Sequence, residues 1–218
     1  MRRWLSRFRI LAMLVAALPL AACSQRKLAR DDIGIAGMVP PLAFHMTDVN
    51  LGRPVTARAF RGKVTLLYFG YTQCPDVCPD TLAKMDKIFA RLGGLSDRVT
   101  FLFVTVDPYR DKPPVLRAYT ALFGSRIVGL RGNANQLFRL ARRYRVVFTV
   151  HRSKNPADYL VTHSSAIYVF GQNGQAQFLI SGLGISQHPD IAGITDDLRQ
   201  LILHPPHRTL LERLASLA

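Results

Sequence analysis

The residues with the clearest potential for chemistry are two cysteines, Cys74 and Cys78, separated by a short turn-prone segment. An apolar run over residues 64–69 precedes them, and its β-branched and aromatic residues are typical of a buried strand. Pro79 suits the first position of a helix, where its missing N–H costs nothing. Apolar residues then recur at spacings of three and four, which predicts a helix with one buried face: Leu82, Met85, Ile88, Phe89 and Leu92.

The predicted position of these cysteines favours reactive thiols. A helix N-terminus lowers the pKa of a thiol, because its unpaired N–H groups favour negative charge. The resulting thiolate attacks disulfides and binds soft metals. A Cys-x-x-Cys turn is typical of thioredoxin-like redox proteins; here one extra residue separates the thiols and Pro75 stiffens the loop. The pair could close a disulfide or chelate one metal ion. A purely structural disulfide would stabilise little across so small a loop.

The order of the remaining elements predicts an α/β fold. A second apolar run over residues 99–106 follows the helix, and strand, helix, strand predicts a βαβ unit with a parallel sheet. Further helices are expected over residues 113–123, 133–144 and 191–203. Further strands are expected over residues 127–130, 146–150, 165–170 and 175–180, with an extra N-terminal strand or hairpin over residues 44–60. This is the thioredoxin plan, a central mixed β-sheet flanked by helices. In that plan the loop holding residues 162–164 lies against the start of the active-site helix.

Three blocks of the sequence resemble the Sco/SenC family, copper-binding proteins on a thioredoxin-like fold. The most specific block covers residues 68–85 and reads YFGYTQCPDVCPDTLAKM. Two supporting blocks follow in order, VTVDP over residues 104–108 and DYLVTHS over residues 158–164. The resemblance extends over residues 39–203. One departure is Thr162, because the family usually has an acidic residue immediately before the histidine. This departure bears on the surroundings of the site more than on its ligands.

The resemblance implies that Cys74, Cys78 and His163 hold one copper ion per chain, as Cu(I) or Cu(II). The donor types agree, since thiolates select Cu(I) and imidazole suits either oxidation state. Zinc is the second metal to consider, but a structural zinc site needs four ligands, and the sequence offers no fourth near these three. The family further implies delivery of copper to the binuclear copper centre of cytochrome c oxidase subunit II or a related copper enzyme.

A thiol–disulfide reductase is the alternative function. In that case Cys74 and Cys78 form a redox-active disulfide, keep the copper-ligand cysteines of the same target reduced, and receive electrons from a periplasmic thioredoxin-like reductant. His163 separates the two hypotheses, because a copper site needs it and a reductase needs only the thiols. A thiol peroxidase fits less well, since Thr72 is only two residues before Cys74 and no proline precedes it as the peroxidase pattern requires.

Two aspartates are weaker candidates for roles around the site. Asp107 ends the strand over residues 99–106 at the same sheet edge as the cysteines, where it could orient a ligand or stabilise the turn into Pro108. Asp76 lies inside the cysteine loop and is either a turn residue or a group that tunes metal affinity. The remaining histidines are expected at the surface or in structural roles: His45, His151, His188, His204 and His207.

The N-terminus carries an export signal. Arginines are followed by an apolar stretch too short to span a bilayer comfortably, and Leu-Ala-Ala before Cys23 resembles a bacterial lipobox. We expect a signal peptide over residues 1–22, a lipidated tether over residues 23–38, a domain over residues 39–203 and an amphipathic tail over residues 204–218. An ordinary secretory peptide with an incidental cysteine is the alternative. The protein is thus expected in the bacterial cell envelope, anchored to a membrane through the lipid on Cys23 and facing the periplasm.

The formal net charge of +15 raises the question of an anionic partner. Expected export argues against nucleic acid as the partner, and the basic residues are scattered rather than interleaved with aromatic stacking residues. Anionic headgroups or an acidic partner protein fit better. A solvated basic face without a specific partner remains the alternative.

Overall fold

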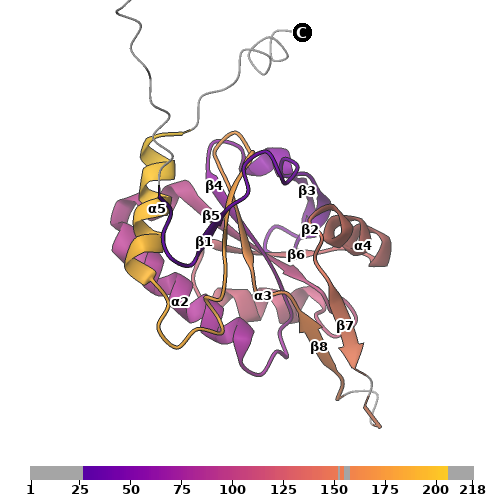
Figure 1. Cartoon of the computed structure of the whole chain (residues 1–218). Coiled ribbons are helices and arrows are strands. Elements are labelled where there is room, and N and C mark those ends of the chain that lie inside the picture. Colours follow the sequence, from indigo (N-terminus) through magenta and orange to yellow (C-terminus); the bar gives the residue numbers. More distant parts are fainter. Residues whose placement is uncertain (1–26, 152, 155–157, 206–218) are drawn as a thin grey trace, which may run out of the picture.

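The computed structural model describes residues 27–151, 153–154 and 158–205. Its main sheet has eight strands in the order β1-β10-β9-β4-β5-β6-β2-β3 (Figure 1). Its parallel strands are β4 (Val64–Gly70), β5 (Val99–Thr105) and β6 (Ile127–Arg131). The hairpin of β9 (Ile167–Phe170) and β10 (Ala176–Ile180) pairs antiparallel with β4. The sheet is therefore mixed, as the thioredoxin plan predicts.

The central strands β4 and β5 are buried along their whole length. Alternation along β4 places Leu66 and Tyr68 in the core on one face of the sheet. Leu67 and Phe69 belong to the core on the other face. Burial on both faces explains why the sequence of β4 is a continuous apolar run rather than an alternating pattern.

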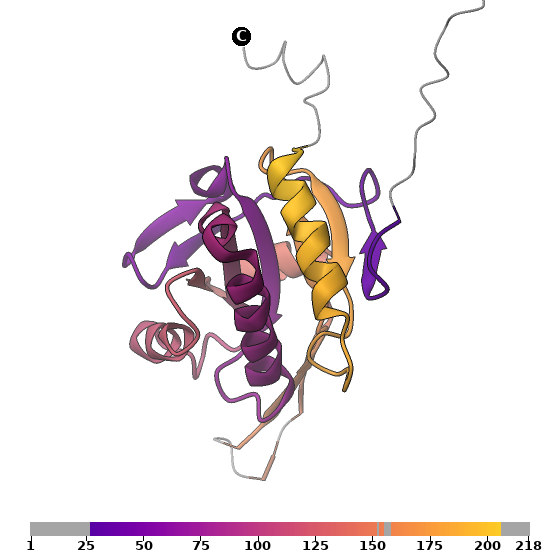
Figure 2. The same ribbon diagram turned by 90° about the vertical axis from the view of Figure 1, so that its left-hand side faces the viewer.

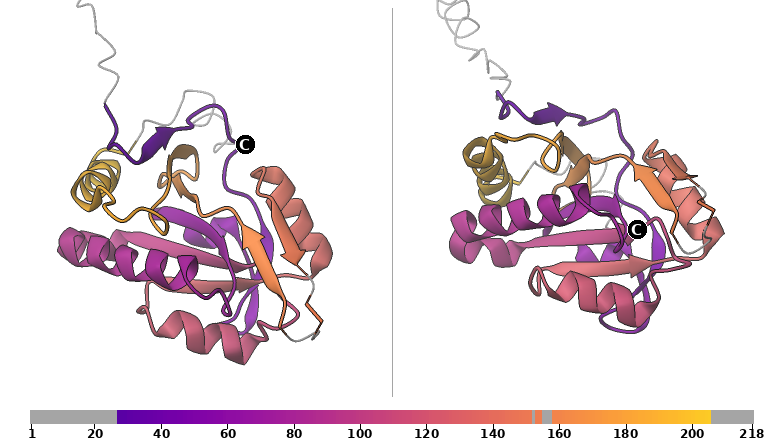
Figure 3. Two further views of the ribbon diagram at one scale, coloured as in Figure 1. Left: turned by 60° about the horizontal axis from the view of Figure 1, so that its bottom comes forward. Right: turned by 90° about the horizontal axis from the view of Figure 1, so that it is seen from below.

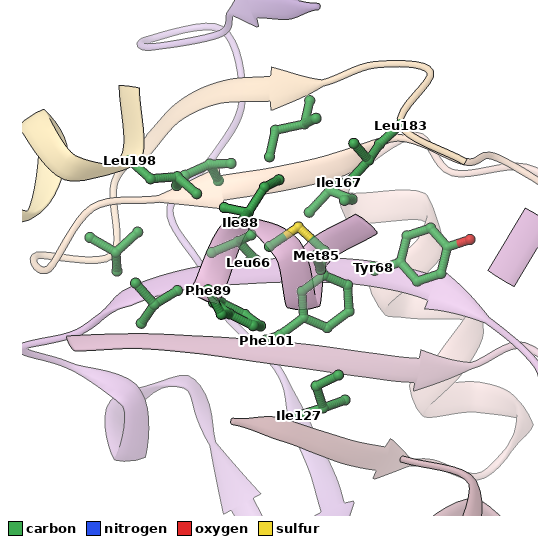
Figure 4. Close-up of a cluster of buried hydrophobic side chains, with 14 of the residues drawn as sticks. Leu66, Tyr68, Met85, Ile88, Phe89, Phe101, Ile127, Ile167, Leu183 and Leu198 are labelled. Atoms are coloured by element: carbon green, nitrogen blue, oxygen red, sulfur yellow. The ribbon is translucent and has the colours of Figure 1, made fainter. Parts of the chain in front are cut away.

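Three helices contribute to the first core: α2 (Val77–Leu92), α3 (Pro113–Ala121) and α5 (Ile191–Leu203). Helices α2 and α5 lie side by side over the sheet (Figure 2). Figure 4 shows this core, where the helix and strand side chains packed together include Met85, Ile88, Phe89, Leu66 and Phe101. The predicted apolar face of α2 is thus the face that packs on the strands.

Helix α4 (Ala134–Arg143) contributes to the second core through Leu137 and Leu140. Its start is fixed by a capping box. The side chain of Asn133 accepts a hydrogen bond from the backbone N–H of Gln136, and the Gln136 side chain accepts one from the backbone N–H of Asn133. This cap agrees with the helix predicted over residues 133–144.

The N-terminal part of the chain enters the sheet earlier than predicted. The expected hairpin over residues 44–60 is formed by β2 (His45–Asp48) and β3 (Arg53–Thr56), followed by the 3-10 turn η1 (Ala57–Phe60). In addition, β1 (Asp32–Gly34) pairs antiparallel with β10. The tether predicted over residues 23–38 therefore includes an edge strand, and the domain begins before residue 39. So short a strand, with two of its three residues exposed, gives no apolar pattern to detect.

Helix α2 begins at Val77, two residues before the predicted start at Pro79. Pro79 is tolerated there because the first N–H groups of a helix have no partner within the helix. Cys78 consequently lies within the first turn of the helix. The helix ends as predicted at Leu92, where the 3-10 turn η2 (Gly93–Arg98) leads into β5.

A two-stranded ribbon of β7 (Phe148–His151) and β8 (Leu160–His163) stands apart from the main sheet and projects from the domain (Figure 1). The strand predicted over residues 146–150 is confirmed as β7. Strand β8 was predicted only as a loop, because Val161 is its one buried residue and the segment has no sustained apolar pattern. The ribbon matters because β8 ends on His163. Figure 3 shows it from below.

In the described part of the chain, no helix is both long enough and apolar enough to cross a membrane. The predicted signal peptide, Cys23 and residues 206–218 of the predicted tail lie outside the described residues.

Candidate metal centre

Two thiols and one imidazole meet near the carboxyl end of β4. The ligand atoms of Cys74, Cys78 and His163 all lie within 4.8 Å of one another. The Sγ atom of Cys78 is 3.3 Å from the Nε2 atom of His163. Among the described residues, these three are the His, Cys, Asp or Glu side chains that lie close enough together to hold a metal ion. The structure thus brings together the three residues that the sequence analysis selected.

The cysteines are positioned by the turn from β4 into α2. The backbone N–H of Cys78, one of the unpaired donors of the first helical turn, points to the Sγ atom of Cys74 at 3.4 Å. The hydroxyl of Tyr68 lies 3.5 Å from the Sγ atom of Cys78. Gly70 permits this approach, because a Cβ atom there would lie 2.8 Å from Phe103 and 3.0 Å from the Cys78 sulfur.

His163 is held in one ring orientation. Its Nδ1 atom lies 3.0 Å from the carbonyl oxygen of Ser164. A carbonyl only accepts, so Nδ1 carries the proton in the neutral ring and the lone pair of Nε2 faces the Cys78 sulfur. The rings of Tyr68 and Tyr71 pack edge-on against the imidazole, with centroid distances of 5.9 and 5.8 Å. The nitrogen that can bind a metal is therefore directed into the group.

The two thiols are not equivalent. The pKa of Cys74 is lowered to about 4. The main cause is a hydrogen bond from Cys78; contacts with His163 and with backbone N–H groups add to it, and burial acts against it. The same hydrogen bond, together with burial, raises the pKa of Cys78. One proton is thus shared, with Cys74 as the thiolate and Cys78 as the thiol. A bound cation would replace that proton and allow both sulfurs to be thiolates.

The group opens to the surface on the Cys74 side. Cys78 is completely buried, whereas Cys74 is half-buried. Cys74 and His163 line a cleft of about 290 Å³, whose walls also include Pro75, Leu160 and Ile185. A ligand from another molecule can approach the group through this cleft.

Asp107 does not join the metal-ligand group, but it fixes the segment that carries His163. Its carboxylate accepts a hydrogen bond from the Tyr159 hydroxyl at 2.6 Å and one from Nε of Arg110 at 2.5 Å. The guanidinium of Arg110 also lies 3.6 Å from the ring centroid of Tyr159 and donates to the Tyr159 carbonyl at 2.9 Å. Tyr159 immediately precedes β8, so this network holds the start of the strand that ends on His163.

Asp76 and Thr162 have less direct relations to the site. Asp76 occupies the N-cap position of α2 without a side-chain capping bond, and it lines the cleft. Thr162, at the departure from the family pattern, is exposed, and its hydroxyl lies 2.7 Å from Nε2 of His151 on the neighbouring strand β7. Neither residue belongs to the metal-ligand group.

Asp111 is a structural residue of the site that the sequence analysis missed. It is completely buried, and its carboxylate accepts three hydrogen bonds: from the Thr72 backbone N–H at 3.1 Å, from the Thr72 hydroxyl at 2.6 Å and from the Thr105 hydroxyl at 2.6 Å. Thr72 is two residues before Cys74, so Asp111 ties the cysteine loop to the end of β5. A carboxylate in a segment with Pro108 and Pro113 gives no sequence signal of burial.

The other histidines agree with their predicted surface roles where they are described. His45, His151, His188 and His204 are exposed and lie outside the metal-ligand group. His207 lies outside the described residues.

The family model described as SCO1/SenC matches residues 42–201. A SCO2-like protein of Rickettsia conorii is 33% identical over 158 residues, which cover 72% of this chain and 73% of that protein. The mitochondrial protein SCO2 of Saccharomyces cerevisiae is 38% identical over 137 residues, which cover 61% of this chain and 44% of that protein. The chain spans about half the length of several curated relatives that it matches.

Solved structures with bound copper are similar in fold and sequence. Yeast Sco1 with copper bound is 30% identical with a TM-score of 0.68, and the match covers 80% of this chain and 94% of that one. ScoI of Bradyrhizobium japonicum with copper bound is 30% identical with a TM-score of 0.63, and the match covers 74% and 98%. The family match spans well over half of the chain and includes Cys74, Cys78 and His163. The chain therefore belongs to the SCO1/SenC family.

Proposed function

We propose that this protein binds one copper ion through Cys74, Cys78 and His163 and delivers it to a copper enzyme. The observation that carries the proposal is the meeting of two thiols and one imidazole within 4.8 Å. Thiolates favour Cu(I), and imidazole binds Cu(I) and Cu(II) alike. A closed zinc site would need a fourth protein ligand, and no further His, Cys, Asp or Glu among the described residues joins the group.

The shape of the site favours transfer over permanent storage. Cys78 anchors one side of the ion in the core, while Cys74 lies at the cleft. A ligand supplied by a partner can reach the ion beside Cys74 and replace the ligands of this protein one after another. Three protein ligands leave a coordination position for this exchange, unlike a closed tetrahedral site.

The proposed recipient is the binuclear copper centre of cytochrome c oxidase subunit II or of a related copper enzyme. This recipient is the one that the Sco/SenC resemblance implies, and the copper-bound relatives support the choice of ion. Residues 1–22 are proposed to direct export, and a lipid on Cys23 is proposed to anchor the protein in the bacterial envelope with its domain in the periplasm. The lipobox-like sequence supports this placement.

Copper stoichiometry and transfer test the proposal. The reduced full chain in neutral detergent is expected to bind one Cu(I) per chain in competition with a Cu(I) chelator. The same loaded chain should then transfer copper to the soluble domain of an oxidase subunit II. Cys74→Ala and Cys78→Ala should each lose tight binding. Stoichiometric binding that survives both substitutions would refute the site.

A thiol–disulfide reductase is the second candidate, favoured by the difference between the two thiols. The Cys74 thiolate would attack a disulfide of the target and form a mixed disulfide, releasing one target thiolate. Cys78 would then lose its proton and attack the Cys74 sulfur, which releases the second target thiolate and leaves a Cys74–Cys78 disulfide. A periplasmic thioredoxin-like dithiol would supply the two electrons that reduce it again. The same pair of thiols cannot be oxidised and bind copper at once.

A further inference from the structure

A second, larger cleft lies between the N-terminal segment and α4. Its volume is about 760 Å³, and it shares no lining residue with the opening at the metal centre. Small-molecule sites in proteins have volumes of this order. The cleft is lined by Pro40, Ala43, Phe44, His45, Gln136, Arg139, Leu140, Arg142 and Arg143.

Hydrogen bonds hold the two walls of this cleft together. The hydroxyl of the buried Tyr144 donates to the carbonyl of Pro41 at 3.1 Å and accepts from the backbone N–H of Ala43 at 3.0 Å. Arg143 donates to the same Pro41 carbonyl at 2.9 Å. His45 Nδ1 lies 3.3 Å from the side-chain amide nitrogen of Gln136. The cleft is therefore fixed by the fold rather than formed by loose side chains.

The charge of the cleft is strongly one-sided. Three guanidinium groups line it, no carboxylate does, and α4 contains no acidic residue. Elsewhere the described chain pairs arginines with aspartates, as at Arg126 and Arg199. The side chains of Arg139 and Arg142 form no hydrogen bond or ion pair with any other described residue, and both are exposed. Such a set of donors suits an anion with several acceptor oxygens.

Apolar surface adjoins these charges. Leu140 is buried at the base of the cleft, and the half-buried Phe44 packs on Phe60. Outside it, Phe138 on α4 is 64% exposed and Met38 on the N-terminal segment is 66% exposed. Basic residues beside exposed apolar side chains are typical of surfaces that lie at the lipid–water interface.

We propose that the cleft binds the phosphate headgroup of an anionic phospholipid, with Arg139 and Arg142 as the main contacts. This proposal rests on the anchoring part of the proposed function. Asp32 of β1 follows Cys23 by nine residues, and even an extended chain of that length spans only about 30 Å. The tether therefore keeps Asp32, at the start of the N-terminal segment, near the membrane. Headgroup binding would fix the orientation of the domain on that membrane.

Native mass spectrometry of the full chain, released from neutral detergent, tests this proposal. One phosphatidylglycerol adduct is expected to bind about tenfold more tightly than a phosphatidylcholine adduct, since the choline cation beside the phosphate is repelled by the arginines of the cleft. The double substitution Arg139→Gln with Arg142→Gln should remove that preference. The matched control Lys87→Gln with Arg91→Gln removes two exposed charges from α2 and should retain it.

Equal binding of the two lipids, or a preference unchanged by the α4 substitutions, would overturn the proposal. Inorganic phosphate is the third probe. If phosphate binds and depends on Arg139 and Arg142 while phosphatidylglycerol does not, the cleft is a free-anion site and the assignment to lipid is wrong. Copper binding measured on the same variants separates the proposals, because the two clefts share no residue.

Discussion

The Nε2 atom of His163 lies 3.3 Å from the sulfur of Cys78, although 85 positions separate the two residues in the chain. The contact depends on three elements. Strand β4 and helix α2 place the buried cysteine, and the ribbon strand β8 brings the histidine over it. The ribbon is not part of the main sheet, and the network of Asp107, Arg110 and Tyr159 holds the start of the strand that ends on His163.

The unequal thiols predict selective alkylation of the metal-free protein. At pH 6, iodoacetamide should modify Cys74 and leave Cys78 unmodified, because the pKa of Cys74 is lowered to about 4 and Cys78 is buried. The alkylation rate of Cys74 should fall only when the pH falls through about 4, where the Cys74 thiolate becomes protonated. Peptide mass spectrometry after timed alkylation measures this. In Cys78→Ala the main hydrogen-bond donor is lost, so the modification rate of Cys74 at pH 6 should decrease. Equal rates at both cysteines would contradict the assignment.

Removal of the Tyr159 hydroxyl should weaken copper binding without unfolding the protein. In Tyr159→Phe the 2.6 Å hydrogen bond to Asp107 is lost, and the start of β8 is held less firmly. Groups that orient a metal ligand typically change affinity by about tenfold or more. Competition with a Cu(I) chelator measures the change. The exposed Tyr109 has no hydrogen bond to Asp107 among the described contacts, so Tyr109→Phe serves as the control. Wild-type affinity in Tyr159→Phe would exclude this positioning role.

Asp111→Ala should destabilise the metal-free protein by about 2 kcal/mol or more, since the buried Thr105 hydroxyl and two part-buried donors of Thr72 lose their acceptor. Urea denaturation of the reduced chain gives the free energy of unfolding. The exposed residue Asp86 on α2 provides the control, and Asp86→Ala should change the free energy by less than about 0.5 kcal/mol. Equal effects of the two substitutions would show that the hydrogen bonds of Asp111 do not stabilise the fold.

A buried carboxyl pair makes stability depend on pH. Asp32 on β1 is buried, and burial together with the neighbouring carboxylate of Asp197 raises its pKa to about 8. Between about pH 4 and pH 8 the folded protein holds a proton that the unfolded chain has lost, so the free energy of unfolding falls as pH rises through this window. Above about pH 8, where Asp32 must be buried as a carboxylate, Asp32→Asn should be more stable than wild type by on the order of 1 kcal/mol.

Paired denaturation curves at pH 5 and pH 8.5 measure this effect. The advantage of Asp32→Asn should be present at pH 8.5 and small at pH 5. The exposed Asp86→Asn should show no pH-dependent difference from wild type. A stability difference for Asp32→Asn that is the same at both pH values would mean that Asp32 has an ordinary pKa.

The sequence was sufficient to predict the parts of the fold with strong local patterns. The continuous apolar run of β4 and the spaced apolar residues of α2 identify a strand and a helix on either side of the cysteines. Strands β1 and β8 could not be found, because each owes its pairing to a neighbouring strand and has only one buried residue.

The same distinction applies to the site. The chemistry of Cys74, Cys78 and His163 follows from their residue types, wherever the fold places them. The family resemblance adds that the three residues act together as ligands of one metal ion. Asp111 and Tyr159 have roles set only by tertiary contacts, so nothing local in the sequence separates them from surface residues. Asp107 was considered as a ligand-orienting residue, and its contacts show that it reaches His163 indirectly, through Tyr159 and β8.

The most direct test of the account is the Cu(I) affinity of His163→Ala in the reduced full chain, measured against a competing chelator. Loss of one of three ligands should weaken binding by on the order of 100-fold, and the exposed His188→Ala should bind as wild type does. Reduction of a disulfide substrate by Cys74 and Cys78 should survive in both variants. Unchanged copper affinity in His163→Ala would contradict the three-ligand copper site.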